Sequence, residues 1–154
     1  MSVPTASGEV PAFAIGILVD SRGWVLIQQR GKDAAKQPLK WACIGGKVGG
    51  GETPLGAAGR ELHQQAGVSL DASLTPWAVE TFTWSHGPVN EYHVFVGPTA
   101  LADADVHTDA GGQVVFVDPV IVPTLDFTES GAHVLGKFLR SEAHAATSAA
   151  AGSL

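Results

Sequence analysis

The stretch from Gly46 to Val68 constrains this sequence more than any other part of it. It begins as a glycine-rich loop, continues through Thr53 and Pro54, and reaches Gly67 after a run of polar and small residues. Threonine is a favoured helix N-cap, and proline is favoured in the first helical turn. Glycine is the commonest residue just beyond the end of a helix. The stretch therefore predicts a loop followed by a helix over residues 54–66.

The polar residues within this stretch follow a fixed spacing. Five residues separate the first glycine from a glutamate, and seven more precede an Arg-Glu pair; these positions are Gly46, Glu52, Arg60 and Glu61. The spacing resembles the Nudix box, G-x5-E-x7-R-E-U-x-E-E-x-G-U with U apolar, the signature of enzymes that hydrolyse a nucleoside diphosphate linked to another group. The chain matches every fixed position except two. Where the box has two adjacent glutamates, this sequence has Gln64 and Gln65.

The resemblance implies a role for each residue of the box. In the family the two adjacent glutamates hold a catalytic Mg²⁺ or Mn²⁺, helped by the glutamate after the arginine and by the backbone of the first glycine. Carried over, the metal positions are Gly46, Glu61, Gln64 and Gln65. The family's arginine, here Arg60, orients the carboxylates, and its loop glutamate, here Glu52, supports the site or helps to activate water. The implied catalytic set is Glu52, Arg60, Glu61, Gln64 and Gln65.

The two glutamines weaken the expected metal site. Mg²⁺ is bound through oxygen ligands and neutralises the charge on the phosphates. A glutamine amide offers a carbonyl oxygen but no charge, so three helix carboxylates become one. Loss of a residue that merely supports a metal ligand costs about 10–100-fold in affinity. Loss of two charged ligands should cost at least as much.

Three explanations are consistent with these glutamines. The protein is a hydrolase that recruits a carboxylate from elsewhere, such as Glu80 or Glu91, and uses Mg²⁺ or Mn²⁺. Alternatively, it uses a Nudix-like pocket for binding, or for a metal-independent reaction that needs no cofactor. The third explanation is a laboratory double substitution of glutamate by glutamine, made to trap a substrate.

Four residues outside the box are candidates for substrate binding. Arg30 closes the second predicted strand, and Lys40 and Lys47 flank the glycine-rich loop, so all three could contact phosphate oxygens. Solvated surface charge explains each of them equally well. Glu91 alternates with His93 onto one face of a predicted strand, which is a spacing suited to acid–base chemistry. A solvent-facing sheet surface also accounts for that pair.

The remaining chain predicts a sheet and a second helix. Apolar runs bounded by turn residues indicate strands at 13–19, 24–29, 78–84, 91–96 and 113–117, with a short strand at Trp41. The first two and the next two strands form expected hairpins. Residues 128–140 have the periodicity of an amphipathic helix. This order and the resemblance predict one domain over residues 1–154, an α/β Nudix-like α/β/α sandwich with a mixed β-sheet.

The composition limits which partners and which cellular compartment are expected for this protein. A net charge of −6 argues against a nucleic acid as the main partner. The Nudix resemblance implies a small diphosphate or nucleotide-like ligand instead. No apolar run is long enough to cross a bilayer, and no signal peptide is recognisable, so a cytoplasmic location is expected. Cys43 lies in an apolar run and is expected to be buried. Residues 1–11 and 141–154 are expected to be loose, and the oligomeric state leaves no readable sign.

Overall fold

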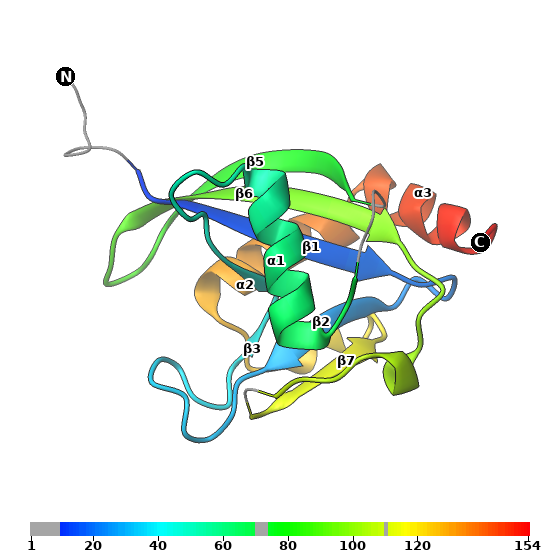
Figure 1. Ribbon diagram of the computed structural model, residues 1–154, viewed down its shortest axis with the longest axis horizontal. Helices are drawn as coiled ribbons and strands as arrows, with labels where there is room; N and C mark the ends of the chain where they lie inside the picture. The colour runs from blue at the N-terminus through cyan, green and yellow to red at the C-terminus, as the bar shows by residue number, and fades with distance from the viewer. Residues whose placement is uncertain (1–9, 70–73, 110) are drawn as a thin grey trace.

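The computed structural model describes residues 10–69, 74–109 and 111–154, and a mixed sheet lies at its centre (Figure 1). The seven strands in these ranges are β1 (Ala12–Val19), β2 (Val25–Gln29), β3 (Trp41–Ala42), β4 (Ile44–Lys47), β5 (Thr75–Thr83), β6 (Val89–Pro98) and β7 (Gln113–Val117). The α-helices are α1 (Pro54–Ala66), α2 (Glu129–Leu139) and α3 (Glu142–Ala151), with 3₁₀ turns η1 (Asp103–Asp105) and η2 (Val122–Thr124).

The sheet has the strand order β3-β2-β1-β6-β5, with β4 paired to β1 and β7 paired to β2. Strand β1 pairs in parallel with β6 and antiparallel with β2 and β4. Both predicted hairpins are confirmed, because β1 pairs with β2 and β5 with β6 in the antiparallel sense. Strand β4, which leads into the loop of the box, is therefore aligned on β1. The second hairpin is aligned on the same strand through β6.

Two apolar cores lie on the two faces of the sheet, which makes the molecule a three-layer structure (Figure 1). On one face, α1 contributes Ala57, Ala58 and Leu62, all fully buried. On the other face, α2 contributes Leu135 and Phe138, which are also fully buried. The alternation of side chains along β1 supplies both cores. The predicted α/β sandwich with a mixed sheet is confirmed.

Helix α1 has the predicted bounds. The Thr53 hydroxyl accepts a hydrogen bond of 3.0 Å from the backbone N–H of Gly56, as an N-cap residue does. At the other end Gly67 adopts a left-handed φ of +69°, and its N–H donates to the carbonyl of His63. Glycine adopts this conformation without the steric penalty that a side chain would bring. These local signals place the box residues on one rigid helix.

The expectation of a loose C-terminal segment over residues 141–154 is wrong, because residues 142–151 form helix α3. Alanine is the best helix former, and small side chains allow close packing without large apolar groups. The ring of His144 bonds the carbonyl of Gly23 at 2.8 Å, and the Ser148 hydroxyl donates to the carbonyl of Asp20. Residues 1–9 of the expected loose N-terminus lie outside the described ranges.

No helix in the described ranges is long and apolar enough to cross a membrane.

Strand β5 is tied to α2 by a charged cluster around Glu80. Its carboxylate accepts hydrogen bonds of 2.9 and 3.1 Å from the Lys137 ammonium and bonds a ring nitrogen of His133 at 3.1 Å. Lys137 contributes most to holding the pKa of Glu80 below its usual range, with a smaller contribution from His133 and against the opposing effect of burial. The ionised carboxylate therefore stabilises the fold at neutral pH, and that contribution is lost as the pH falls through the lowered pKa.

Replacing Glu80 by glutamine is expected to lower the free energy of unfolding by about 1 kcal/mol at neutral pH, because Lys137 is half exposed and its pairing is screened by water. In acid, below the lowered pKa, the wild-type carboxyl is neutral as well, so the two proteins should converge. Urea unfolding of both proteins at neutral and acidic pH measures this. A difference that stays undiminished in acid would contradict the assigned charge effect.

Candidate functional site

The site is built where α1 crosses β4. In β4, Gly45 and Gly46 pair with Ile15 and Ala14 of β1. A Cβ atom added at Gly46 would lie 2.0 Å from a carboxylate oxygen of Glu61, so only glycine lets that side chain lie directly on the strand. The position of the Glu61 carboxylate against β4 therefore depends on the glycine of the box.

Arg60 holds both box carboxylates. Its Nε and Nη2 atoms donate to the two oxygens of Glu52 at 2.7 and 3.0 Å, and Nη1 donates to Glu61 Oε2 at 3.1 Å. Nη2 also donates to the carbonyl of Lys47 at 3.1 Å. Arg60 and, to a lesser extent, the N–H of Gly49 hold the pKa of Glu52 below its usual range. Glu52, in turn, contributes most to raising the pKa of Arg60.

The two glutamines of the box are placed differently. Gln65 lies inside the site, where its Nε2 atom donates to Glu61 Oε1 at 2.7 Å and to the carbonyl of Gly45 at 3.0 Å. Its Oε1 atom accepts a hydrogen bond from Nε2 of Gln28 on β2. Gln64 is exposed, and its Oε1 atom lies at the long distance of 3.4 Å from Nη1 of Arg60. The structure thus brings together the five catalytic candidates, with Gln64 at the margin.

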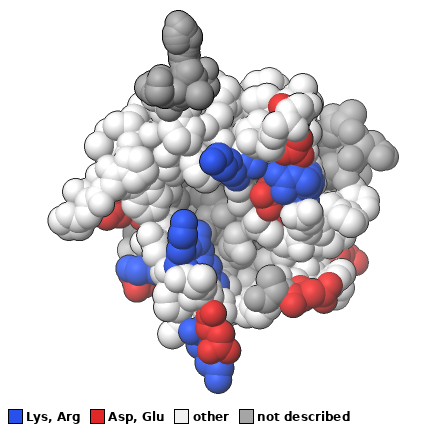
Figure 2. Space-filling view, turned by 60° about the vertical axis from the view of Figure 1, so that its left-hand side comes forward, with Lys and Arg blue, Asp and Glu red and all other residues white. Residues whose placement is uncertain are grey.

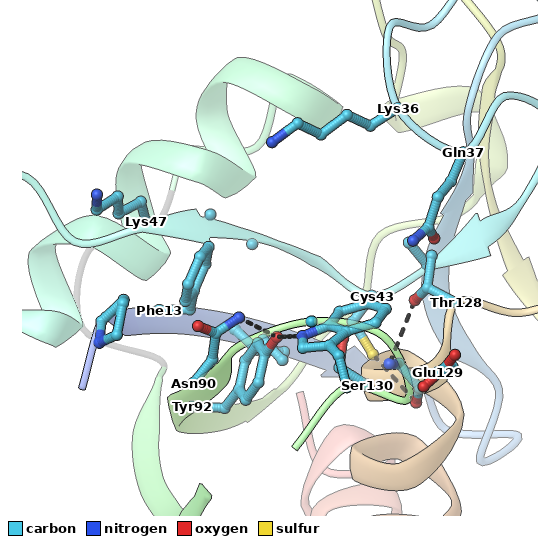
Figure 3. A pocket seen from close by; sticks show the side chains of 18 of the residues that line it. Phe13, Lys36, Gln37, Cys43, Lys47, Asn90, Tyr92, Thr128, Glu129 and Ser130 are labelled. Atoms are coloured by element: carbon cyan, nitrogen blue, oxygen red, sulfur yellow. Dashed lines mark hydrogen bonds between the residues drawn. The ribbon is translucent and has the colours of Figure 1, made fainter. Parts of the chain in front are cut away.

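A cavity of about 690 Å³ opens beside β4 (Figure 3). Its walls come from β1, from β4, from the tip of the β5–β6 hairpin and from the start of α2. Phe13 and Tyr92 form an aromatic wall, with ring centroids 5.4 Å apart, and Trp84 Nε1 donates to the Tyr92 hydroxyl at 3.2 Å. Glu129 accepts hydrogen bonds from the N–H and hydroxyl of Ser85, which ties the hairpin tip to α2.

Three cations line this cavity, namely Arg30, Lys36 and Lys47. Among the described residues, no carboxylate lies within ion-pair distance of any of them. Arg30 donates to the carbonyl of Lys36 at 3.0 Å, and partial burial lowers its pKa. Figure 2 shows Lys and Arg side chains on opposite sides of a hollow, and Figure 3 places Lys36 across the cavity from Asn90 and Tyr92. The cavity is therefore electropositive in an acidic protein.

Comparison with known proteins identifies the family. The sequence pattern of the NUDIX domain matches residues 9–140. The chain belongs to the NUDIX family. Among curated proteins, no sequence matches significantly. The resemblance inferred from the box is therefore confirmed at the level of the family.

Several solved structures share the fold. The Escherichia coli dihydroneopterin triphosphate pyrophosphohydrolase is 20% identical with a TM-score of 0.68, and the match covers 85% of this chain and 98% of that one. The NUDIX domain of Shewanella oneidensis NrtR, solved with ADP ribose, is 11% identical with a TM-score of 0.69, covering 83% and 85%. The E. coli ORF135 protein is 21% identical with a TM-score of 0.69, covering 88% and 93%.

The Nudix site of this chain does not fit a tightly held divalent metal. The described residues contain no group of three or more His, Cys, Asp or Glu side chains placed to hold one. Both oxygens of Glu52 are bound by Arg60, and the two oxygens of Glu61 are bound by Arg60 and Gln65. The carbonyl of Gly45 is occupied by Gln65 as well. The carboxylate oxygens of Glu52 and Glu61 and the carbonyl oxygen of Gly45 are thus already hydrogen-bonded to N–H donors.

Two of the four substrate-binding candidates line the cavity beside β4 and two do not. Arg30 and Lys47 line it, whereas Lys40 pairs with Asp126 at 2.8 Å outside it. Glu91 also lies outside the cavity, paired with His93 at 2.8 Å. It is adjacent to Tyr92 on β6, so it points to the opposite face of the sheet.

Recruitment of Glu80 as a metal ligand finds no support in the described residues, and neither does a nucleophilic role for Cys43. Glu80 is engaged by α2, on the opposite face of the sheet from α1. Cys43 lines the cavity but is buried as expected, and burial raises the pKa of its thiol to about 12. A thiol with such a pKa is not a thiolate nucleophile at neutral pH.

Sequence reasoning missed three cavity residues, for different reasons. Phe13 and Tyr92 lie in apolar strand patterns and look like ordinary core residues. Lys36 lies in the polar segment between β2 and β3, where a charged residue carries no distinguishing signal. Each becomes recognisable only when the fold brings the strands, that segment and the start of α2 together around one space.

Proposed function

We propose that this Nudix protein takes an organic diphosphate, such as a nucleoside diphosphate derivative, into the cavity and hydrolyses it weakly through a degenerate metal site. The observation that carries the proposal is the set of three cations, Arg30, Lys36 and Lys47, that line the cavity and have no carboxylate partner among the described residues. A partly desolvated guanidinium without a counter-ion favours an anion as its partner.

The size and the walls of the cavity support the organic part of this ligand. A volume of about 690 Å³ lies in the range of small-molecule sites, roughly 300–1,000 Å³. Phe13 and Tyr92 offer a ring surface on which a planar group can pack, and buried Asn90 adds an amide at the same wall. A ligand with a flat group at one end and phosphates at the other complements both walls.

Relatives of known structure support the same ligand class. One is named a dihydroneopterin triphosphate pyrophosphohydrolase, and another was crystallised with ADP ribose. Both compounds combine a heterocycle with linked phosphates. The structural likeness itself supports the fold, and the three cations that line the cavity support the ligand.

A second candidate function is binding without turnover. The specific observation in its favour is that Arg60 and Gln65 already satisfy the oxygens of Glu61, while Arg60 holds Glu52. A protein with this arrangement retains the cavity and its cations while lacking a charged metal cluster. Such a chain would act as a receptor for the same class of ligand.

One experiment separates the two functions. The purified protein is incubated with ADP ribose, nucleoside diphosphate sugars and other diphosphates in Mg²⁺ or Mn²⁺, and phosphate or nucleotide release is measured. Calorimetry follows binding of the same compounds. Slow metal-dependent turnover supports the hydrolase, and binding without turnover at high protein concentration supports the receptor. Failure to bind any compound of the panel would overturn both.

Replacing Lys36 by alanine is expected to weaken ADP binding about fivefold, because an exposed charged contact contributes about 1 kcal/mol. Lys32 provides a matched control, since it is an exposed lysine of the same segment that does not line the cavity. Calorimetric titration at one fixed ionic strength compares the Lys36→Ala and Lys32→Ala variants. Equal losses in both variants would mean that overall charge, and not this wall, governs binding.

A further inference from the structure

In the box of this chain, the side chain of Gln65 makes hydrogen bonds at a position where the family has a charged metal ligand. With glutamates at positions 64 and 65, four carboxylates would face one arginine, and a cation would be required to offset their repulsion. Here two carboxylates, Glu52 and Glu61, face Arg60. The remaining acceptors are the second oxygen of Glu61 and the carbonyl of Gly45, and one atom, Nε2 of Gln65, donates to both.

We infer that the Gln65 side-chain amide takes the place of a cation between Glu61 and the Gly45 carbonyl, so that the resting Nudix site, before any ligand enters, is complete without metal. The amide nitrogen has two hydrogens, and the two acceptors lie 2.7 and 3.0 Å from it. A cation between a carboxylate and a carbonyl oxygen would satisfy the same two atoms. In this role the amide contributes hydrogen bonds and no net charge.

Gln28 fixes the direction of that amide. A glutamine side chain can present either its oxygen or its nitrogen to the same space, and the hydrogen-bond partners decide which. Gln28 Nε2 donates to Gln65 Oε1 and also to the carbonyl of Cys43 at 3.3 Å. With the oxygen of Gln65 held by this donor, its nitrogen must face Glu61. Gln28 on β2 is therefore the positioning residue of this arrangement.

Because the hydrogen-bond network around Gln65 is partly buried, replacing the Gln65 amide by a carboxylate should lower the stability of the protein. The Glu61 side chain is 12% exposed, and Gln28 and Gln65 are both partly buried. A carboxylate at position 65 would face two acceptors and leave both without a donor. Unsatisfied acceptors and like charges in such a place cost far more than on an open surface. The same carboxylate would also create the metal ligand that the chain lacks.

The test is the thermal stability of the Gln65→Glu variant with and without Mn²⁺. In EDTA, its Tm is expected to fall by about 3–10 °C, because one donor to two acceptors is lost. Millimolar Mn²⁺ should recover much of that loss, whereas the Tm of the wild type should be the same in EDTA and in Mn²⁺. Gln64→Glu is the matched control: it adds the same charge one residue away, at an exposed position, and should change the Tm in EDTA only slightly.

A second variant tests Gln28. Gln28→Glu places an acceptor opposite Gln65 Oε1, so the amide is driven to turn its nitrogen toward Gln28 and its oxygen toward Glu61. Its Tm should fall, as for Gln65→Glu, and exchange protection of the Gln65 side-chain amide hydrogens, followed by NMR, should decrease. A Gln65→Glu protein as stable as the wild type in EDTA, or a wild type that Mn²⁺ stabilises as strongly as that variant, would overturn the inference.

The consequence for the ligand rests on the proposed function. If the site is complete without metal, ADP should bind the wild type equally well in EDTA and in Mn²⁺. A requirement for metal in binding would contradict the inference even if the Tm results agreed with it. If no diphosphate binds at all while the Tm results hold, the proposed function fails and the amide replacement stands.

Discussion

Replacing Gln64 and Gln65 together by glutamate is expected to raise Mn²⁺-dependent hydrolysis of a diphosphate by about 100-fold or more. Two ligand charges are restored beside Glu61, and even a residue that only supports a ligand is worth about 10–100-fold in metal affinity. The rest of the box needs no change, because Arg60 already holds Glu52 and Glu61 in place. Phosphate release from the substrate panel, with calorimetric titration of Mn²⁺ into both proteins, measures the gain.

The control for this reversion is Gln113→Glu. Gln113 is an exposed glutamine on β7 whose amide donates to the side chain of Gln29, outside the cavity lining and the box. Its replacement adds negative charge without adding a ligand, and should leave metal affinity unchanged. Equal Mn²⁺ affinity in the reverted and wild-type proteins would show that any metal is held elsewhere. Tighter metal binding without hydrolysis would show that the cavity serves another task.

Local signals made the box helix predictable from the sequence. Thr53 and Gly67 are adjacent in the chain to the helix ends that they terminate, so the side-chain oxygen of one and the left-handed φ of the other act within a few residues. The two hairpins were predictable for the same reason, since each joins neighbouring strands through a short turn. Information about these elements lies entirely within the segments that form them.

Partners of charged side chains were not predictable in this way. Lys40 and Lys47 looked equivalent in the sequence, yet Lys40 meets Asp126, which is 86 residues away, and Lys47 lines the cavity. The contact between Gln28 and Gln65 spans 37 residues and depends on how α1 settles on β4. Helix α3 was not predicted, because its alanines provide little apolar surface for packing. Alanine nevertheless has the highest helix propensity, and the helix packs closely on the β1–β2 turn.

Strand β4, which carries residues of both the box and the cavity lining, can approach β1 closely because position 45 is a glycine. A Cβ atom at Gly45 would lie 2.3 Å from the carbonyl oxygen of Ala14 and 3.0 Å from the Cα atom of Ile15. Both are backbone atoms of β1, whose side chains here are buried, so they cannot rotate away as a flexible side chain would. Real Cβ atoms do not approach backbone atoms so closely, and β4 would have to separate from β1.

Gly45→Ala is therefore expected to lower the free energy of unfolding by about 3 kcal/mol, the upper end of the usual cost of forcing extra atoms into a packed interior. The same change should weaken ligand binding, since Gly45 lines the cavity and its carbonyl holds Gln65. Gly50→Ala is the matched control, because nothing lies within 4 Å of a Cβ atom there and its φ is not positive. Urea unfolding should place Gly50→Ala within about 0.5 kcal/mol of the wild type. Equal stability of the two variants would mean that β4 is not held against β1 at Gly45, and the support that this strand gives to Glu61 and Gln65 would have to come from another contact.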